Sequence, residues 1–247
     1  MRLKSGILAL FLLGFVAGHA QFKKGMKMAG ANIASVVFNS GSSDIEVASI
    51  GSNTSKTTSY NINIGPSLGW FVSDNTVVGV TFTLNPYGQK VSYEQSGSTY
   101  QSDKTNSFNI GVGGFARNYF TSSGSLHPFA QASLNGGVST LKTDGFFYGG
   151  SGSAAYKDTY TGKSNGGTFV NAALTGGFTK MVGENAGLDF FIGYNFSYNK
   201  HTFKRTILRD EGVNGSVDTR SENETTTKFT NHGFLFGIGF QVFFGRK

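Results

Sequence analysis

Along most of the chain, apolar side chains recur at every second position. Between residues 188 and 199 every even-numbered residue is large and apolar, and the residues between are mostly small or polar. Because a β-strand sends successive side chains to opposite faces, such a segment has one apolar face and one polar face. The pattern recurs at residues 60–70, 78–85, 108–113, 130–138, 170–178 and 234–242, and more weakly at 27–38. The sequence therefore predicts an all-β chain of eight strands.

The segments that connect these strands alternate strictly between long and short. Long polar connections cover residues 39–56, 89–105, 142–166 and 204–227, and short ones cover 73–75, 121–127 and 183–186. Alternate connections of an up-and-down barrel gather at opposite ends, and strands of about 10 residues can cross a bilayer at a tilt. We expect an eight-stranded antiparallel up-and-down transmembrane β-barrel with long polar loops at one end.

The N-terminal segment has the features of a secretory signal. Arg2 and Lys4 precede an apolar run over residues 6–17, and Gly18 and Ala20 are the small residues of a cleavage site. The run is shorter than the ~18 apolar residues that a spanning helix needs. We expect a signal peptide at residues 1–20 and a barrel domain at 21–247.

Charge and cysteine content exclude several classes of function. The chain has no cysteine, which excludes disulfides, thiol nucleophiles and thiolate zinc sites. Without the signal, 19 basic residues face 14 acidic ones, and five of the basic residues lie at the two ends of the chain. The body of the chain thus lacks the basic patch that nucleic-acid binding requires.

The signal peptide, the eight alternating strands and the aromatic last strand at 234–244 resemble those of small eight-stranded outer-membrane β-barrels of Gram-negative bacteria, such as the OmpA transmembrane domain. The resemblance covers residues 21–247 and implies a location in the cell outer membrane. An even number of strands places both termini at the short-turn end, which is the periplasmic end in this family. Such proteins usually finish on an aromatic residue, whereas Gly245, Arg246 and Lys247 follow Phe244 here, so the assembly route stays open.

Hydrocarbon offers no partner for backbone N–H and C=O groups, so a sheet crosses a membrane only as a closed barrel with its apolar face outward. A soluble carrier of the lipocalin type would turn that face inward. The glycine, asparagine and serine residues of the polar face favour a crowded lumen. We expect interfacial aromatics near the strand ends: Tyr60, Trp70, Tyr87, Tyr119, Tyr198 and Phe244.

Eight strands enclose a space only wide enough for side chains, so no wide pore is expected. Five phenylalanines take positions of the polar face in the half of the strands nearest the short turns. We expect them to form an aromatic floor of the lumen: Phe71, Phe115, Phe129, Phe191 and Phe243. A polar lining is expected above it from Asn61, Asn63, Asn85, Asn109, Asn135, Asn171, Asn195 and Asn199. Arg117 and Asp189 also face inward near the floor, where a charge without a partner would be costly, and we predict that they pair.

Two motifs of soluble enzymes occur in the wrong context. A G-x-S-x-G match at residues 65–69 and a dinucleotide-type glycine pattern at 111–116 both lie inside alternating strands, without the helix that their chemistry requires. A surface site that combines His232 with Ser221 and Glu222 or Glu224 would need loop folding to form. An enzyme with such a surface site would modify lipids as a deacylase or acyltransferase, and this is the catalytic alternative.

These observations favour a monomeric barrel without catalytic activity, metal or cofactor, in a structural or surface-interaction role. Outer-membrane lipid and lipopolysaccharide are the expected surroundings, and a protein or other surface ligand would bind the long loops. The last of these segments mixes arginines with acids, which predicts a solvated, salt-bridged hairpin. A soluble periplasmic carrier remains the second alternative.

Overall fold

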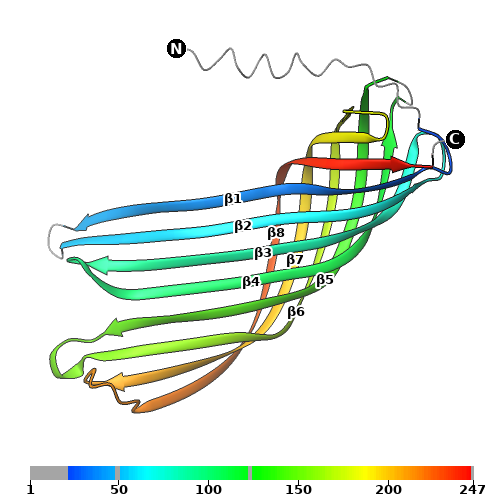
Figure 1. The fold of residues 1–247 in the computed structure, drawn as a ribbon. Coiled ribbons are helices and arrows are strands. Elements are labelled where there is room, and N and C mark those ends of the chain that lie inside the picture. The colour runs from blue at the N-terminus through cyan, green and yellow to red at the C-terminus, as the bar shows by residue number, and fades with distance from the viewer. Residues whose placement is uncertain (1–21, 48–50, 122–123, 246–247) are drawn as a thin grey trace, which may run out of the picture.

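The computed structural model describes residues 22–47, 51–121 and 124–245, so the predicted signal peptide lies outside the described residues. Eight antiparallel strands form a closed barrel in the order β1 to β8 (Figure 1), as predicted. The strands are β1 (Lys27–Val47), β2 (Gly51–Phe71), β3 (Thr76–Gln95), β4 (Ser98–Tyr119), β5 (Leu126–Gly149), β6 (Tyr156–Met181), β7 (Ala186–Glu211) and β8 (Thr219–Phe244). In the described part of the chain, the one helical segment is a single 3-10 turn, Gly152–Ala154, and no helix is long and apolar enough to cross a membrane.

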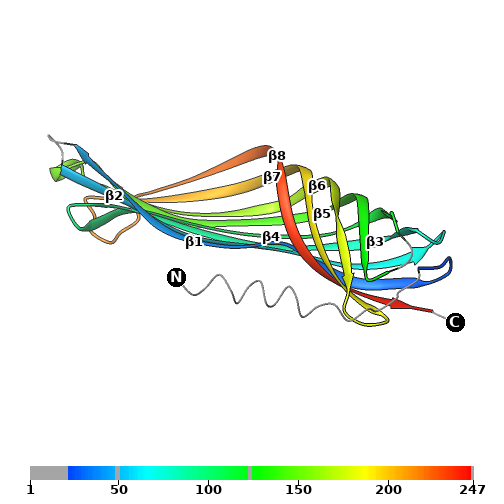
Figure 2. The same ribbon diagram turned by 90° about the horizontal axis from the view of Figure 1, so that it is seen from above.

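The expectation of long polar loops is wrong. Most of residues 39–56, 89–105, 142–166 and 204–227 belongs to the strands, which continue well beyond their apolar part as paired hairpins. These polar segments are rich in threonine and tyrosine, which favour strands, and an antiparallel sheet can face water. We call this part of β1–β8 the hairpin extension; Figures 1 and 2 show it as long ribbons that run away from the end where β1 begins and β8 ends.

The outer surface near the termini is a belt of exposed apolar side chains. Leu174 is 68% exposed and Ile192 is 50% exposed, and every strand contributes residues of this kind. On β7 the belt runs from Leu188 to Tyr198, a length that at ~3.3 Å per residue and a tilt near 40° spans about 25 Å. This orientation is opposite to that of a soluble carrier barrel, and it matches the hydrocarbon core of a membrane.

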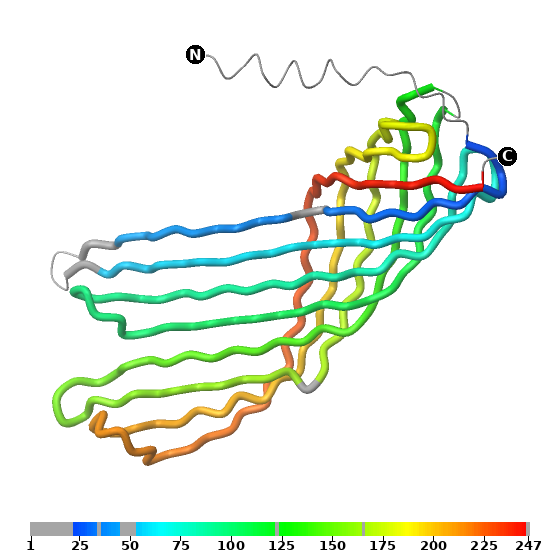
Figure 3. The backbone as a smooth tube through the Cα atoms, in the orientation of Figure 1, coloured from blue at the N-terminus to red at the C-terminus, as the bar shows by residue number. Residues whose placement is uncertain are grey.

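The barrel closes over a short stretch only. β1 pairs with β8 from Lys27 opposite Phe244 to Ile33 opposite Ile238, and the register of β1 against β2 then shifts between Ile33 and Ser35. Beyond this point the described residues of β1 pair with β2 alone and those of β8 with β7 alone. Figure 3 shows the two strands diverging, and we call the gap between them the seam.

Candidate functional site: the lumen and its closed floor

The end of the lumen nearest the termini is filled by a compact apolar cluster, the floor cluster. Its buried members are Phe22, Met26, Met28, Phe71, Val77, Phe115, Tyr119, Phe129, Met181 and Phe243, with Phe191 packed against them. Phe22 lies at the centre, with ring centroids 4.4 Å from Tyr119, 4.9 Å from Phe243 and 5.1 Å from Phe71. It precedes the first strand, so no alternation in the sequence pointed to it.

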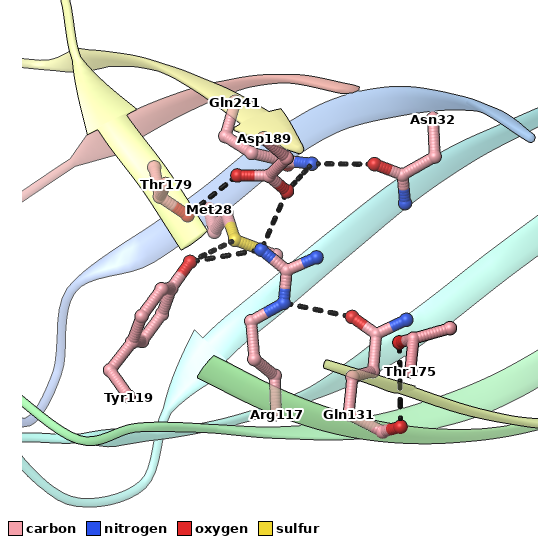
Figure 4. A network of polar contacts seen from close by, with 9 residues as sticks. All are labelled: Met28, Asn32, Arg117, Tyr119, Gln131, Thr175, Thr179, Asp189 and Gln241. Carbon is pink, nitrogen blue, oxygen red and sulfur yellow. Dashed lines mark hydrogen bonds and ion pairs between the residues drawn. The ribbon is translucent and has the colours of Figure 1, made fainter. Parts of the chain in front are cut away.

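A buried ion pair lies directly above this cluster. Nη1 of Arg117 donates to Oδ2 of Asp189 at 2.7 Å, and both side chains are at most 1% exposed. Thr179 and Gln241 also donate to the carboxylate, at 2.6 and 3.1 Å (Figure 4). Nε of Arg117 donates to Gln131 at 2.8 Å, and the guanidinium lies 4.0 Å from the ring centre of Phe129. The two charges thus compensate each other and are held by neutral polar groups, as burial demands.

Two of the expected interfacial aromatics face the lumen instead. Tyr119 is fully buried, and its Oη accepts a hydrogen bond from Arg117 at 3.0 Å (Figure 4). Its position near a strand end suggested the membrane interface, but it shares the parity of Arg117 and so points inward. Tyr87 lies opposite Asn61 and donates to Gln89 at 3.0 Å on the inward face.

The other four lie on the outward face. Tyr60, Trp70 and Phe244 are 39%, 45% and 49% exposed, and Tyr198 is partly exposed and pairs with the exposed Val170.

The asparagines form two sets above the floor. Asn85 donates to Asn61 at 2.7 Å, Asn109 donates to Asn85 at 3.1 Å, and Ser139 donates to Asn109, which makes a ladder across four strands. Asn63, Asn135, Asn171 and Asn195 line a chamber of about 120 Å³ together with Asn32 and Arg117. That volume holds a few water molecules. Asn199 lies opposite Phe169, on the inward face of β7.

A serine and a histidine that the sequence analysis did not connect meet at the top of the ladder. Oγ of Ser139 lies 3.5 Å from Nε2 of His201, and both residues are buried. They lie on β5 and β7, which are separated by β6, so the curvature of the sheet brings them together. His201 lies just beyond the apolar belt, and burial lowers the pKa of its imidazole. No described side chain contacts its Nδ1, so the third group that orients a catalytic base is missing from the described residues.

The surface constellation considered for catalysis does not assemble. Oη of Tyr194 lies 2.6 Å from Nδ1 of His232 on the outward face. Ser221 lies on the same strand, eleven residues away, which at ~3.3 Å per residue is more than 30 Å. Glu222 and Glu224 face Arg220 and Lys204 instead. Among the described residues no group of three or more His, Asp or Glu side chains could hold a metal ion.

No family model matches the sequence, and no curated protein matches it either. Among solved structures, the chain is similar to the outer membrane protein OprG from Pseudomonas aeruginosa, with 15% identity and a TM-score of 0.40 over 92% of this chain and 99% of that one. It is similar to the N-terminal β-barrel domain of OprF from the same organism, with 13% identity and a TM-score of 0.31 over 90% and 98% of the two chains. It is also similar to Neisserial surface protein A, with 16% identity and a TM-score of 0.30 over 89% of this chain and 97% of that one.

These likenesses concern the fold alone. The closed order of eight strands and the outward apolar belt are features of this chain itself, and they identify an eight-stranded β-barrel of the outer-membrane type.

Proposed function

We propose that this protein is an integral outer-membrane barrel without a wide pore or enzymatic activity, which presents the hairpin extension as a surface-interaction element. The observation that carries the proposal is the closed floor. Phe22, Tyr119 and the Arg117–Asp189 pair are all at most 2% exposed, which supports a lumen filled by side chains at this level.

The orientation follows from the two ends of the barrel. The short turns, the start of β1 and the end of β8 lie at the floor, and the polar hairpins lie at the other end. We therefore assign the floor to the periplasm and the hairpin extension to the cell exterior, where outer-membrane lipid, lipopolysaccharide and external ligands would surround a monomeric barrel.

The continuous strand pairing of the extension supports a binding role. β6 and β7 stay paired from Tyr156 opposite Glu211 down to the floor, and Arg209 binds both oxygens of Asp158 at 2.8 Å. Hydrogen bonding to Asp158 raises the pKa of Arg209, because this cross-strand link stabilises the charged guanidinium. A preorganised surface loses little entropy when it binds a partner.

Orientation is tested by cysteine labelling, which is clean because the chain has no cysteine of its own. Ser216→Cys lies in the exposed β7–β8 turn, and Ser73→Cys lies in the exposed β2–β3 turn. A membrane-impermeant maleimide should label the first on intact cells and the second only after the outer membrane is permeabilised. The opposite pattern would reverse the assigned orientation.

Closure of the lumen is tested in planar bilayers. The refolded protein should show no stable ohmic conductance, and a large one would refute the closed floor. The absence of catalysis is tested with radiolabelled phospholipid and lipopolysaccharide. Acyl release that is lost in His201→Ala or His232→Ala would overturn that part of the proposal.

The seam favours a second candidate function, which is exchange of small apolar molecules between the lumen and the lipid. Phe234 and Phe236 of β8 are 79% and 67% exposed at the level where β8 has no pairing with β1. Leu235 between them lines the lumen chamber. Unpaired strand edges at membrane depth are costly, so a gap at this level calls for a function.

A carbene-forming alkane dissolved in the bilayer distinguishes the two candidates. If the seam admits apolar molecules, the label reaches Leu235 as well as Phe236, and peptide mass spectrometry detects both. Label confined to outward-facing residues would exclude the exchange function.

A further inference from the structure

A second cavity lies far from the floor, on the inward face of the hairpin extension. It has a volume of about 380 Å³, within the range of about 300–1,000 Å³ of small-molecule sites. Four neighbouring strands contribute to it: Gln101 and Asp103 from β4, Phe147 from β5, Asp158 and Tyr160 from β6, and Arg205 and Ile207 from β7. We call it the Arg205 pocket.

Arg205 is the cation in this pocket whose charge is not balanced. The carbon atom at the centre of its guanidinium lies 3.8 Å from the ring centre of Tyr160, and its Nε is buried without a hydrogen-bond partner. No carboxylate among the described residues forms an ion pair with it. Asp158, which also lines the pocket, accepts hydrogen bonds from Arg209 on both of its oxygens.

The local sequence fixes the position of Arg205. Gly145 lies opposite Tyr160, and a Cβ at this glycine would lie 2.5 Å from the ring. Glycine therefore lets Tyr160 lie flat across the sheet. Gly162 lies directly opposite Arg205. A Cβ at Gly162 would meet Thr143 and Phe203 instead, so Gly145 is the glycine that makes room for the ring on which the Arg205 guanidinium rests.

The remaining groups of the pocket select the rest of the ligand. Nε2 of Gln101 donates to Oδ2 of Asp103 at 2.7 Å, and Oδ1 of Asp103 accepts no hydrogen bond from the described residues. This oxygen can accept from a hydroxyl group. Phe147 and Ile207 supply an apolar surface for a ring face. A bare phosphate would satisfy Arg205 but would leave Asp103 and the apolar side chains of the pocket without a partner.

We propose that the Arg205 pocket binds a carboxylated saccharide of the hexuronic acid type. The sugar carboxylate pairs with Arg205, a hydroxyl donates to Asp103, and the apolar ring face packs on Phe147. Arginine is suited to this task because its planar fork matches a carboxylate in two parallel hydrogen bonds. This inference rests on the proposed surface role, for which it names the ligand.

The test is calorimetric titration of the full mature chain, refolded in detergent. Methyl α-galacturonide should bind saturably. Methyl α-galactoside, which has a neutral hydroxymethyl group in place of the carboxylate, should bind about tenfold more weakly or worse, as expected for loss of a charge-assisted hydrogen bond. Arg205→Gln should lose the preference. Arg220→Gln is the matched control, because Arg220 is a 66% exposed arginine of the same extension, paired with Glu222 outside the pocket.

Three outcomes would overturn the proposal: equal affinity for the two sugars, unchanged galacturonide affinity in Arg205→Gln, or no saturable binding to the parent protein at millimolar concentration. Tighter binding of galactose 6-phosphate than of the galacturonide would also refute it. Loss of folding in Arg205→Gln is checked by gel mobility before and after heating, and Phe147→Ala then serves as the second variant, expected to weaken galacturonide binding.

Both the cell's own envelope polysaccharide and an external glycan can supply this chemistry. If protein purified from native membranes already carries hexuronic acid, the ligand is the cell's own polysaccharide. If it binds the sugar only after addition, the ligand is external. Failure of the titration leaves the maleimide and conductance results untouched, so the ligand and the surface role are judged separately.

Discussion

Replacing Asp189 by asparagine isolates the charge of the floor ion pair, because the shape of the side chain is nearly kept. The carboxylate has no exposure and accepts hydrogen bonds from Arg117, Thr179 and Gln241. In Asp189→Asn the guanidinium of Arg117 stays buried without a counter-charge. Removal of one partner from a buried pair costs about 3–5 kcal/mol, and we expect the free energy of unfolding to fall by that amount.

The measurement is urea titration in lipid vesicles, followed by the fluorescence of Trp70, the single tryptophan of the chain. Asp144→Asn is the control, since Asp144 pairs with Lys142 at 3.4 Å on the surface and such pairs contribute at most about 1 kcal/mol. The double variant Arg117→Met with Asp189→Leu removes both charges and should recover much of the loss. A single variant within about 1 kcal/mol of the parent, or a double variant no better than the single one, would refute the reasoning.

Three further outcomes follow from the structure. Phe22→Ala removes the central ring of the floor cluster and should lower the free energy of unfolding by about 3–5 kcal/mol while admitting small conductance steps in bilayers. Gly79→Ala should reduce folding yield in vesicles, because its Cβ would lie 2.2 Å from the carbonyl oxygen of Leu68, whereas Gly41→Ala meets nothing within 4 Å and should not. Burial lowers the pKa of His201 below its ordinary 6.5, so stability should hold above that pH and fall as the pH drops through it; His201→Gln should flatten this dependence in unfolding curves from pH 7.5 to 5.

The strand count and the antiparallel barrel could be predicted from sequence because one face of each strand is apolar. The same parity places Arg117 and Asp189 on the inward face, and the structure puts their charged atoms 2.7 Å apart. Tyr119 shows that the position of a residue along its strand does not by itself tell which face the side chain takes. Its place near a strand end suggested the interface, although its parity, which is that of Arg117, already pointed inward.

The hairpin extension could not be predicted because it is polar on both faces. The segment from Lys204 to Glu211 carries no period-two hydrophobic signal, yet it pairs with β6 residue by residue. Only cross-strand pairing shows that Arg205 lies over Tyr160, and those residues are 45 positions apart in the chain. The seam is equally invisible in the sequence, since it depends on where β1 and β8, the two ends of the sheet, cease to pair.

Some of the inward-facing glycines are required by the closed floor. A ring cannot fit inside an eight-stranded barrel unless the neighbouring strand leaves space for it. A Cβ at Gly79 would lie 2.6 Å from the ring of Phe115, and one at Gly237 would lie 2.2 Å from the ring of Phe191. Each phenylalanine thus occupies the volume that a glycine on another strand leaves empty. A glycine-poor barrel of the same size would have to exclude these rings, and its lumen would be filled by smaller side chains or by water. The rings of the floor and these glycines therefore depend on each other: a larger residue at the glycine would displace the ring, and a smaller residue in place of the ring would leave a cavity.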